Sequence, residues 1–70
     1  MLNRNLRSIE EYKSVLERNP SDNYAHFKLG QVYQETEDYA LAIKEFLRAR
    51  ELGLNNARVY LELGRTYGEM

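Results

Sequence analysis

The chain is 70 residues long, which is enough for one small domain with a modest core. It has no cysteine and one histidine, which excludes disulfides and a thiolate zinc site and leaves helix packing or association with other chains as the source of stability. Ten basic and eleven acidic residues are interleaved to a net charge of −1, without the basic excess of a nucleic-acid binder.

No apolar run approaches the length of a membrane-spanning helix, and the first residues lack the apolar core of a signal peptide. We therefore expect no membrane partner and no nucleic-acid partner. A cytoplasmic location is expected on the same grounds, since the absence of cysteine fits a reducing compartment.

Apolar spacing and helix-stop signals predict four helices. The first runs over residues 4–18, with its apolar stripe on one face. Pro20 ends it, because proline disfavours helical geometry in the residue before it, and Ser21 or Asp22 is the expected cap of the next helix.

The second predicted helix extends to about Thr36, and Asp38 is the expected cap of the third. Gly53 supplies the stop of the third helix, because glycine tolerates the left-handed conformation in which helices often end. Asn55 or Asn56 is expected to cap the fourth helix, whose apolar spacing repeats that of the second.

The chain repeats itself with a period of 34 residues. Gly30 corresponds to Gly64, two helix-interior glycines that each cost about 1 kcal/mol against alanine and therefore need a packing reason. The other matching pairs are Leu29 and Leu63, Tyr33 and Tyr67, Ile9 and Ile43, and Tyr12 and Phe46. The second helix thus resembles the fourth, and the first resembles the third.

Spacing and residues together resemble the tetratricopeptide repeat (TPR). The stretch His26-x2-Leu29-Gly30-x2-Tyr33 is similar to the first helix of the family pattern, and Ala42-x3-Phe46-x2-Ala49 to the second. Pro20 stands where the family has its inter-repeat proline, whereas Leu54 replaces that proline one period later. His26 departs from the large apolar residue that is usual at its position. In the family, the glycine allows close helix approach against a small residue, a role for which Ala42 is suited.

The resemblance implies an all-α, right-handed solenoid of about four antiparallel helices in a single domain, residues 1–70. Residues 23–56 would form one full repeat. Residues 4–18 would be the second-type helix of a preceding half repeat, and residues 57–70 the first-type helix of a following one. Tyr12, Tyr33, Phe46 and Tyr67 are expected to fill the space between neighbouring helices rather than to stack on a ligand.

The family binds protein or peptide partners on the concave face of its first-type helices, which implies an interaction scaffold. The corresponding positions are Tyr24, Phe27, Gln31, Gln34, Arg58, Leu61 and Arg65. The alternative is a solvated surface, in which Arg58 pairs with Glu62 and Arg65 with Glu69 along the helix. The basic clamp with which co-chaperone members hold a chaperone carboxylate is poorly matched, because Arg58 is the one basic residue at its places.

A second hypothesis is a self-assembly module, because the two half repeats leave apolar helix faces that a longer array would cover. The faces are complementary to each other, so the fourth helix of one chain would pack on the first helix of the next. Such a contact is heterologous and yields a ring, a reciprocal swapped dimer or an open fibre. The residues expected between chains are Ile9, Tyr12, Tyr60, Leu63, Gly64 and Tyr67.

Neither catalysis nor a cofactor is expected. His26 lies on the packing stripe with Leu29 and Tyr33, where a core role is favoured over that of a general base. The acidic pairs lie on exposed turns and faces without an apolar pocket to raise a carboxylate pKa. One histidine makes no metal site, and the phosphate-loop and nucleophile motifs do not occur.

Overall fold

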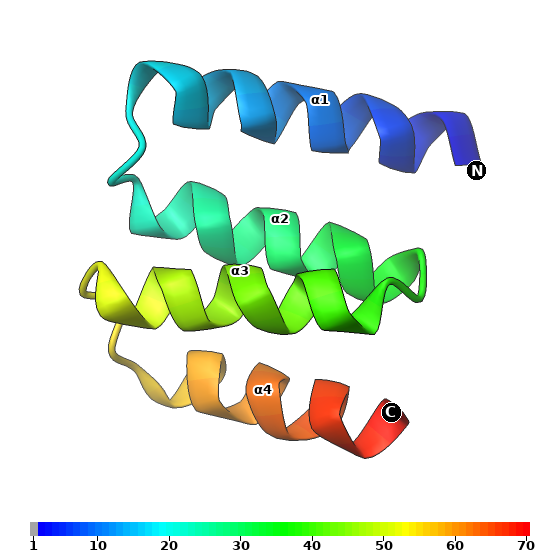
Figure 1. The fold of residues 1–70 in the computed structure, drawn as a ribbon, viewed down its shortest axis with the longest axis vertical. Helices are drawn as coiled ribbons and strands as arrows, with labels where there is room; N and C mark the ends of the chain where they lie inside the picture. The colour runs from blue at the N-terminus through cyan, green and yellow to red at the C-terminus, as the bar shows by residue number, and fades with distance from the viewer. Residues whose placement is uncertain (1) are drawn as a thin grey trace.

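The computed structural model describes residues 2–70, with side chains from residue 4 onwards. Four helices occupy this part of the chain: α1 (Leu2–Arg18), α2 (Asn23–Glu35), α3 (Tyr39–Glu51) and α4 (Ala57–Glu69). Successive helices run antiparallel, and α3 lies alongside α2 (Figure 1). The predicted all-α helical-hairpin solenoid is therefore confirmed, with α1 beginning two residues earlier than the sequence indicated.

Local polar residues define where the helices begin. The Asp22 carboxylate accepts a hydrogen bond from the Ala25 amide at 3.0 Å, and the Asn56 side chain accepts one from the Val59 amide at 3.2 Å. Both satisfy amides that the first turn leaves without partners. Asp38 stands at the expected position but makes no capping bond, because its carboxylate accepts from the Thr36 hydroxyl at 2.7 Å.

The two tight turns after α2 and α3 close in the same way. The Asp38 amide donates to the carbonyl of Tyr33, and the Leu54 amide donates to the carbonyl of Ala49, each at 2.9 Å. This closure requires a left-handed residue just before the donor. Gly53 fills that place in the second turn with φ +107°, as its sequence position predicted, but Glu37 fills it in the first with φ 64°.

Replacing Glu37 by glycine should stabilise the chain. The left-handed conformation costs a residue with a Cβ about 1–2 kcal/mol, whereas glycine loses about 0.5–1 kcal/mol of additional entropy on folding. We expect a net gain of about 0.5 kcal/mol in the free energy of unfolding, measured by urea denaturation. Glu37→Ala is the control, because it removes the same carboxylate and keeps the strain; an equal gain in both variants would contradict the explanation.

The core lies between α2, α3 and α4. Phe46 is completely buried at its centre, and its ring centroid lies 5.6 Å from that of Phe27 in a tilted arrangement. Around this pair are the other buried apolar residues of the cluster, which are Leu29, Tyr33, Ala42, Ile43, Ala49, Val59 and Leu63. Three residues of α1 pack against the cluster from outside and remain half-buried: Ile9, Tyr12 and Leu16.

The two equivalent glycines have different surroundings. A Cβ on Gly30 would lie 2.7 Å and 2.8 Å from two ring atoms of Phe46, so glycine is needed for α2 to approach α3. The atoms nearest to that Cβ belong to the Phe46 ring, one turn after Ala42 on α3. A Cβ on Gly64 would meet nothing within 4 Å. The packing reason inferred for both glycines thus exists within the chain at Gly30 alone.

Candidate partner-binding groove

A hollow of about 260 Å³ lies between the N-terminal halves of α2 and α4, and we call it the basic hollow. Tyr24 is 60% exposed there, and the Lys28 ammonium lies 5.8 Å from the centroid of its ring. The lining is Tyr24, Phe27, Lys28, Gln31, Leu54, Asn56 and Arg58. Two cationic groups therefore stand beside apolar surface, with no acidic side chain in the lining.

A second hollow of about 490 Å³, the acidic hollow, lies between the C-terminal halves of the same helices. Its lining is Gln31, Gln34, Glu35, Tyr39, Glu62, Arg65 and Glu69. Three carboxylates against one guanidinium make this end negative. Because both hollows share Gln31, they form one α2–α4 groove with a basic end and an acidic end.

A hydrogen-bond network holds α2 and α4 together along the acidic hollow. The Gln34 amide donates to the Thr66 hydroxyl at 2.6 Å and to the Glu62 carboxylate at 3.2 Å. The Thr66 hydroxyl in turn donates to the Glu62 carbonyl at 2.6 Å. Thr66 and Glu62 are buried, so these bonds satisfy polar groups that would otherwise lack partners. The network joins α2 to α4 at this hollow, whereas the side chains of Glu35 and Glu69 are exposed.

The structure brings most of the expected groove residues together. Tyr24, Gln31 and Arg58 line the basic hollow, and Gln34 and Arg65 line the acidic hollow. Leu61 lines neither hollow but is 59% exposed on α4. Phe27 reaches the wall of the basic hollow yet is buried, so it is chiefly a core residue, because α3 places Phe46 against it.

The helix-surface ion pairs expected from the sequence do not form. The guanidinium of Arg65 lies 3.8 Å from the Glu62 carboxylate, one turn before it, rather than near Glu69. Arg58 has no ion pair among the described residues, because Glu62 turns inward to Gln34. The guanidinium of Arg58 is therefore available to a ligand in the basic hollow.

The structure also shows several groove residues that the sequence reasoning missed. Lys28 lies one turn after Tyr24, and Leu54 takes the place of the missing inter-repeat proline; both line the basic hollow. In the acidic hollow Tyr39 is half-buried, and this burial, followed by the carboxylates of Glu37 and Glu69, raises its pKa. The neutral phenol is therefore the form present near pH 7. Of these residues, Lys28 alone could have been found from the sequence, because it lies four residues after Tyr24 on the same helix.

The residues expected between chains divide into two groups. Tyr60 and Tyr67 are about half exposed on α4, and Gly64 is open to solvent. Ile9 and Tyr12 are half-buried against the core, so each keeps one free side. Leu63 is buried within its own chain and is not available to another, because it packs in the cluster with Val59.

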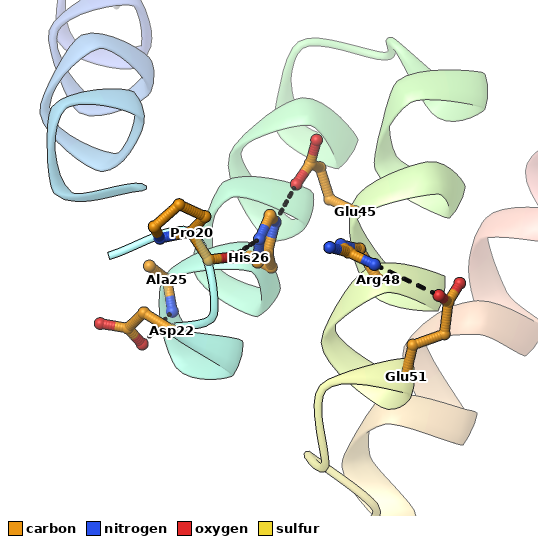
Figure 2. A network of polar contacts seen from close by, with 7 residues as sticks. All are labelled: Pro20, Asp22, Ala25, His26, Glu45, Arg48 and Glu51. Atoms are coloured by element: carbon orange, nitrogen blue, oxygen red, sulfur yellow. Dashed lines mark hydrogen bonds and ion pairs between the residues drawn. The ribbon is translucent and has the colours of Figure 1, made fainter. Parts of the chain in front are cut away.

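His26 joins three elements on the other side of α2. Figure 2 shows its ring between the Pro20 carbonyl and the Glu45 side chain on α3. Its Nδ1 lies 2.7 Å from the carboxylate and its Nε2 lies 2.9 Å from the carbonyl. Both partners are acceptors, so a ring that carries protons on both nitrogens satisfies the two contacts. The position holds the α1–α2 turn against α3 and lies away from both hollows.

Two further properties of the described part of the chain concern metal-ligand groups and membrane-spanning helices. Among residues 4–70, no three His, Asp or Glu side chains are grouped closely enough to hold a metal ion. None of the helices in the described part of the chain is long and apolar enough to cross a membrane.

Comparison with known proteins agrees with the geometry. A family model described as tetratricopeptide repeat matches residues 2–57, and a second, overlapping match covers residues 28–67. No curated protein matches the sequence significantly. The two matches overlap across the helix pair α2 and α3 and together extend over all four helices. The chain therefore belongs to the tetratricopeptide-repeat family.

Proposed function

We propose that the chain is an interaction scaffold whose α2–α4 groove binds a peptide or helix of a partner protein. Tetratricopeptide repeats are non-catalytic scaffolds that generally mediate protein–protein interaction. The observation that carries the proposal is that the basic hollow combines the exposed Tyr24 ring with two basic groups, Lys28 and Arg58, which form no ion pair within residues 4–70. Exposed aromatic and arginine side chains are the types that contribute most to protein interfaces.

The charges of the groove define the kind of ligand. Lys28 and Arg58 favour a carboxylate at the basic hollow, where a guanidinium forms two parallel hydrogen bonds to it. The carboxylates of Glu35 and Glu69 favour a basic side chain at the acidic hollow. The expected ligand is therefore a short segment with an apolar and acidic end followed by a basic end. Its orientation along α2 is set by this charge pattern.

Reversing the charge of Arg58 should weaken binding. Peptides selected from a random displayed library against the wild-type chain supply the ligand, and fluorescence anisotropy supplies the dissociation constant. Arg58→Glu is expected to raise that constant at least tenfold, about 1.4 kcal/mol, because a charge-assisted bond is replaced by repulsion. The affinity of the wild type should fall with added salt, since exposed charges are screened.

Lys44→Glu is the matched control. It makes the same charge reversal on α3, where Lys44 is exposed and lines neither hollow. It should leave the dissociation constant within about twofold, and circular dichroism should show both variants folded. An equal loss of affinity in the two variants would mean that the effect comes from the change in net charge alone. Full affinity in Arg58→Glu would move the site away from the basic hollow.

A further inference from the structure

A third hollow, of about 550 Å³, lies on the opposite flank of α2, between that helix and α1. Its lining is Arg4, Asn5, Ser8, Tyr12, Lys28, Gln31, Val32 and Glu35. We call it the open seat. Ser8, Tyr12 and Lys28 are each half-buried in it, so the surface is formed but uncovered on one side.

The repeat shows what shape fits the open seat. Shifting its residues by 34 positions turns Ser8, Tyr12, Lys28 and Val32 into Ala42, Phe46, Glu62 and Thr66. All four of these equivalents are buried, and the helix that covers them is α2. Gly30 of α2 lies against the ring of Phe46, and Gln34 of α2 bonds to Glu62 and Thr66. The open seat is therefore equivalent to the site on α3 and α4 that holds α2, a first-type helix, within the same chain.

We propose that the open seat receives α4 of a second copy of this chain. The helix α4 carries the pattern of α2, with Gly64 in the place of Gly30 and Leu61 in that of Phe27. In the free chain Gly64 faces open space, as a glycine would before an aromatic ring packs on it. In the junction that ring is Tyr12, the equivalent of Phe46. The missing Cβ of Gly64 then has the packing role that its own chain does not supply.

The polar residues of the two surfaces also match. Within the chain, Gln31 and Glu35 of α2 line a hollow opposite Glu62, Arg65 and Glu69. The 34-residue shift places Arg65 and Glu69 of the second copy opposite Lys28, Gln31 and Glu35. The charged side chains that face one another there are two basic and two acidic, so their charges balance. Likewise, the places of His26 and Glu45 become those of Tyr60 of the second copy and Glu11. In the single chain the Tyr60 hydroxyl donates to the Asn55 side chain at 2.9 Å, so its bond to Glu11 replaces that one.

The contact joins two different surfaces, so it is heterologous. A copy that inserts its α4 still has an open seat, and growth continues beyond the dimer. The open seat shares Lys28, Gln31 and Glu35 with the α2–α4 groove but lies between α2 and α1. Tyr24 and Arg58 are outside its lining, so the two proposals are tested at different residues. In sedimentation equilibrium over a hundredfold concentration range, the mean mass of the wild type should rise steadily past that of a dimer. A monomer at every concentration, or a mass that stops at the dimer, would overturn the proposal.

Two glycine variants separate assembly from folding. A Cβ on Gly64 has free space in the single chain, so Gly64→Ala should raise the thermal midpoint by about 4 °C. In the junction the same Cβ strikes Tyr12, so the association constant should fall at least tenfold. Gly68→Ala is the control: its Cβ is equally free, and its equivalent Gln34 already carries a side chain at the seat. It should gain the same stability and associate like the wild type; equal association of the two variants would overturn the proposal.

A mixing experiment tests the direction of the contact. Ser8→Arg fills the open seat and leaves α4 intact, whereas Gly64→Ala blocks α4 and leaves the seat intact. Each variant alone should remain monomeric. Their equimolar mixture should form a dimer and nothing larger, since one copy offers only α4 and the other only the seat. A mixture that stays monomeric, or either variant assembling alone like the wild type, would contradict a head-to-tail junction.

Discussion

Phe46→Ala is expected to leave the chain largely unfolded at 25 °C. The Phe46 side chain is the largest of the completely buried side chains and touches both Gly30 and Phe27. Emptying such a site costs about 3–5 kcal/mol, because the transfer free energy is lost and a cavity remains. A domain of this size has a total stability of about 3–5 kcal/mol. The loss therefore equals the whole stability, and thermal and urea transitions followed by circular dichroism should lose their cooperativity.

Leu41→Ala is the control for this experiment. Leu41 lies on the same helix and is 44% exposed, so its truncation should cost less than about 1 kcal/mol. The pair compares a central with a peripheral apolar residue of α3. A Phe46→Ala variant that unfolds cooperatively within about 1 kcal/mol of the wild type would mean that the core does not centre on this ring.

Gly30→Ala should destabilise the chain, although alanine is the better helix former. The added Cβ would lie 2.7 Å from the Phe46 ring, and relieving such a contact costs about 1–3 kcal/mol. The gain in helix propensity is about 1 kcal/mol, so overpacking dominates. With an overpacking cost near the middle of its range, we expect a net loss of about 1 kcal/mol in the free energy of unfolding, measured by urea denaturation.

The variant Phe46→Leu tests whether the contact with the Phe46 ring causes this loss, because leucine is smaller than phenylalanine. Combined with Gly30→Ala, it should remove part of the clash, so the double variant should be more stable than the sum of the two single losses. Strict additivity would show that the penalty at position 30 has another source. A Gly30→Ala variant as stable as the wild type would contradict the close approach of α2 and α3.

The helices and their ends were predictable because their signals are local. Pro20 and Gly53 stop α1 and α3, and the repeated spacing identifies the core positions on each helix. For α2 and α4 the sequence predicted two possible capping residues each. In the structure Asp22 caps α2 and Asn56 caps α4, because their side chains accept hydrogen bonds from amides of the first turn. Asp38 stands at the predicted N-cap position of α3, but its carboxylate makes no capping bond, since it accepts from the Thr36 hydroxyl two residues away.

The groove was only partly predictable, because its residues depend on neighbours far along the chain. The helix α2 contacts all three other helices, so periodicity alone does not separate its groove side from its core side. For this reason the sequence predicted Phe27 on the groove surface, whereas the structure buries it. The carboxylate of Glu62 reads as exposed, yet Gln34, which is 28 residues away, draws it inward. As a result, Arg58 loses the ion-pair partner expected from its i,i+4 spacing to Glu62. The spacing of charges along one helix does not predict this loss.

Chemical-shift mapping of the isotope-labelled chain is the direct test of whether partners bind in the α2–α4 groove. A selected peptide is titrated at a protein concentration where the chain is monomeric, or into Gly64→Ala if assembly intervenes. We expect the largest amide shifts on α2 and α4, around Tyr24, Gln31 and Arg58. Shifts concentrated on the outer face of α3 around Lys44, with the groove unchanged, would contradict it.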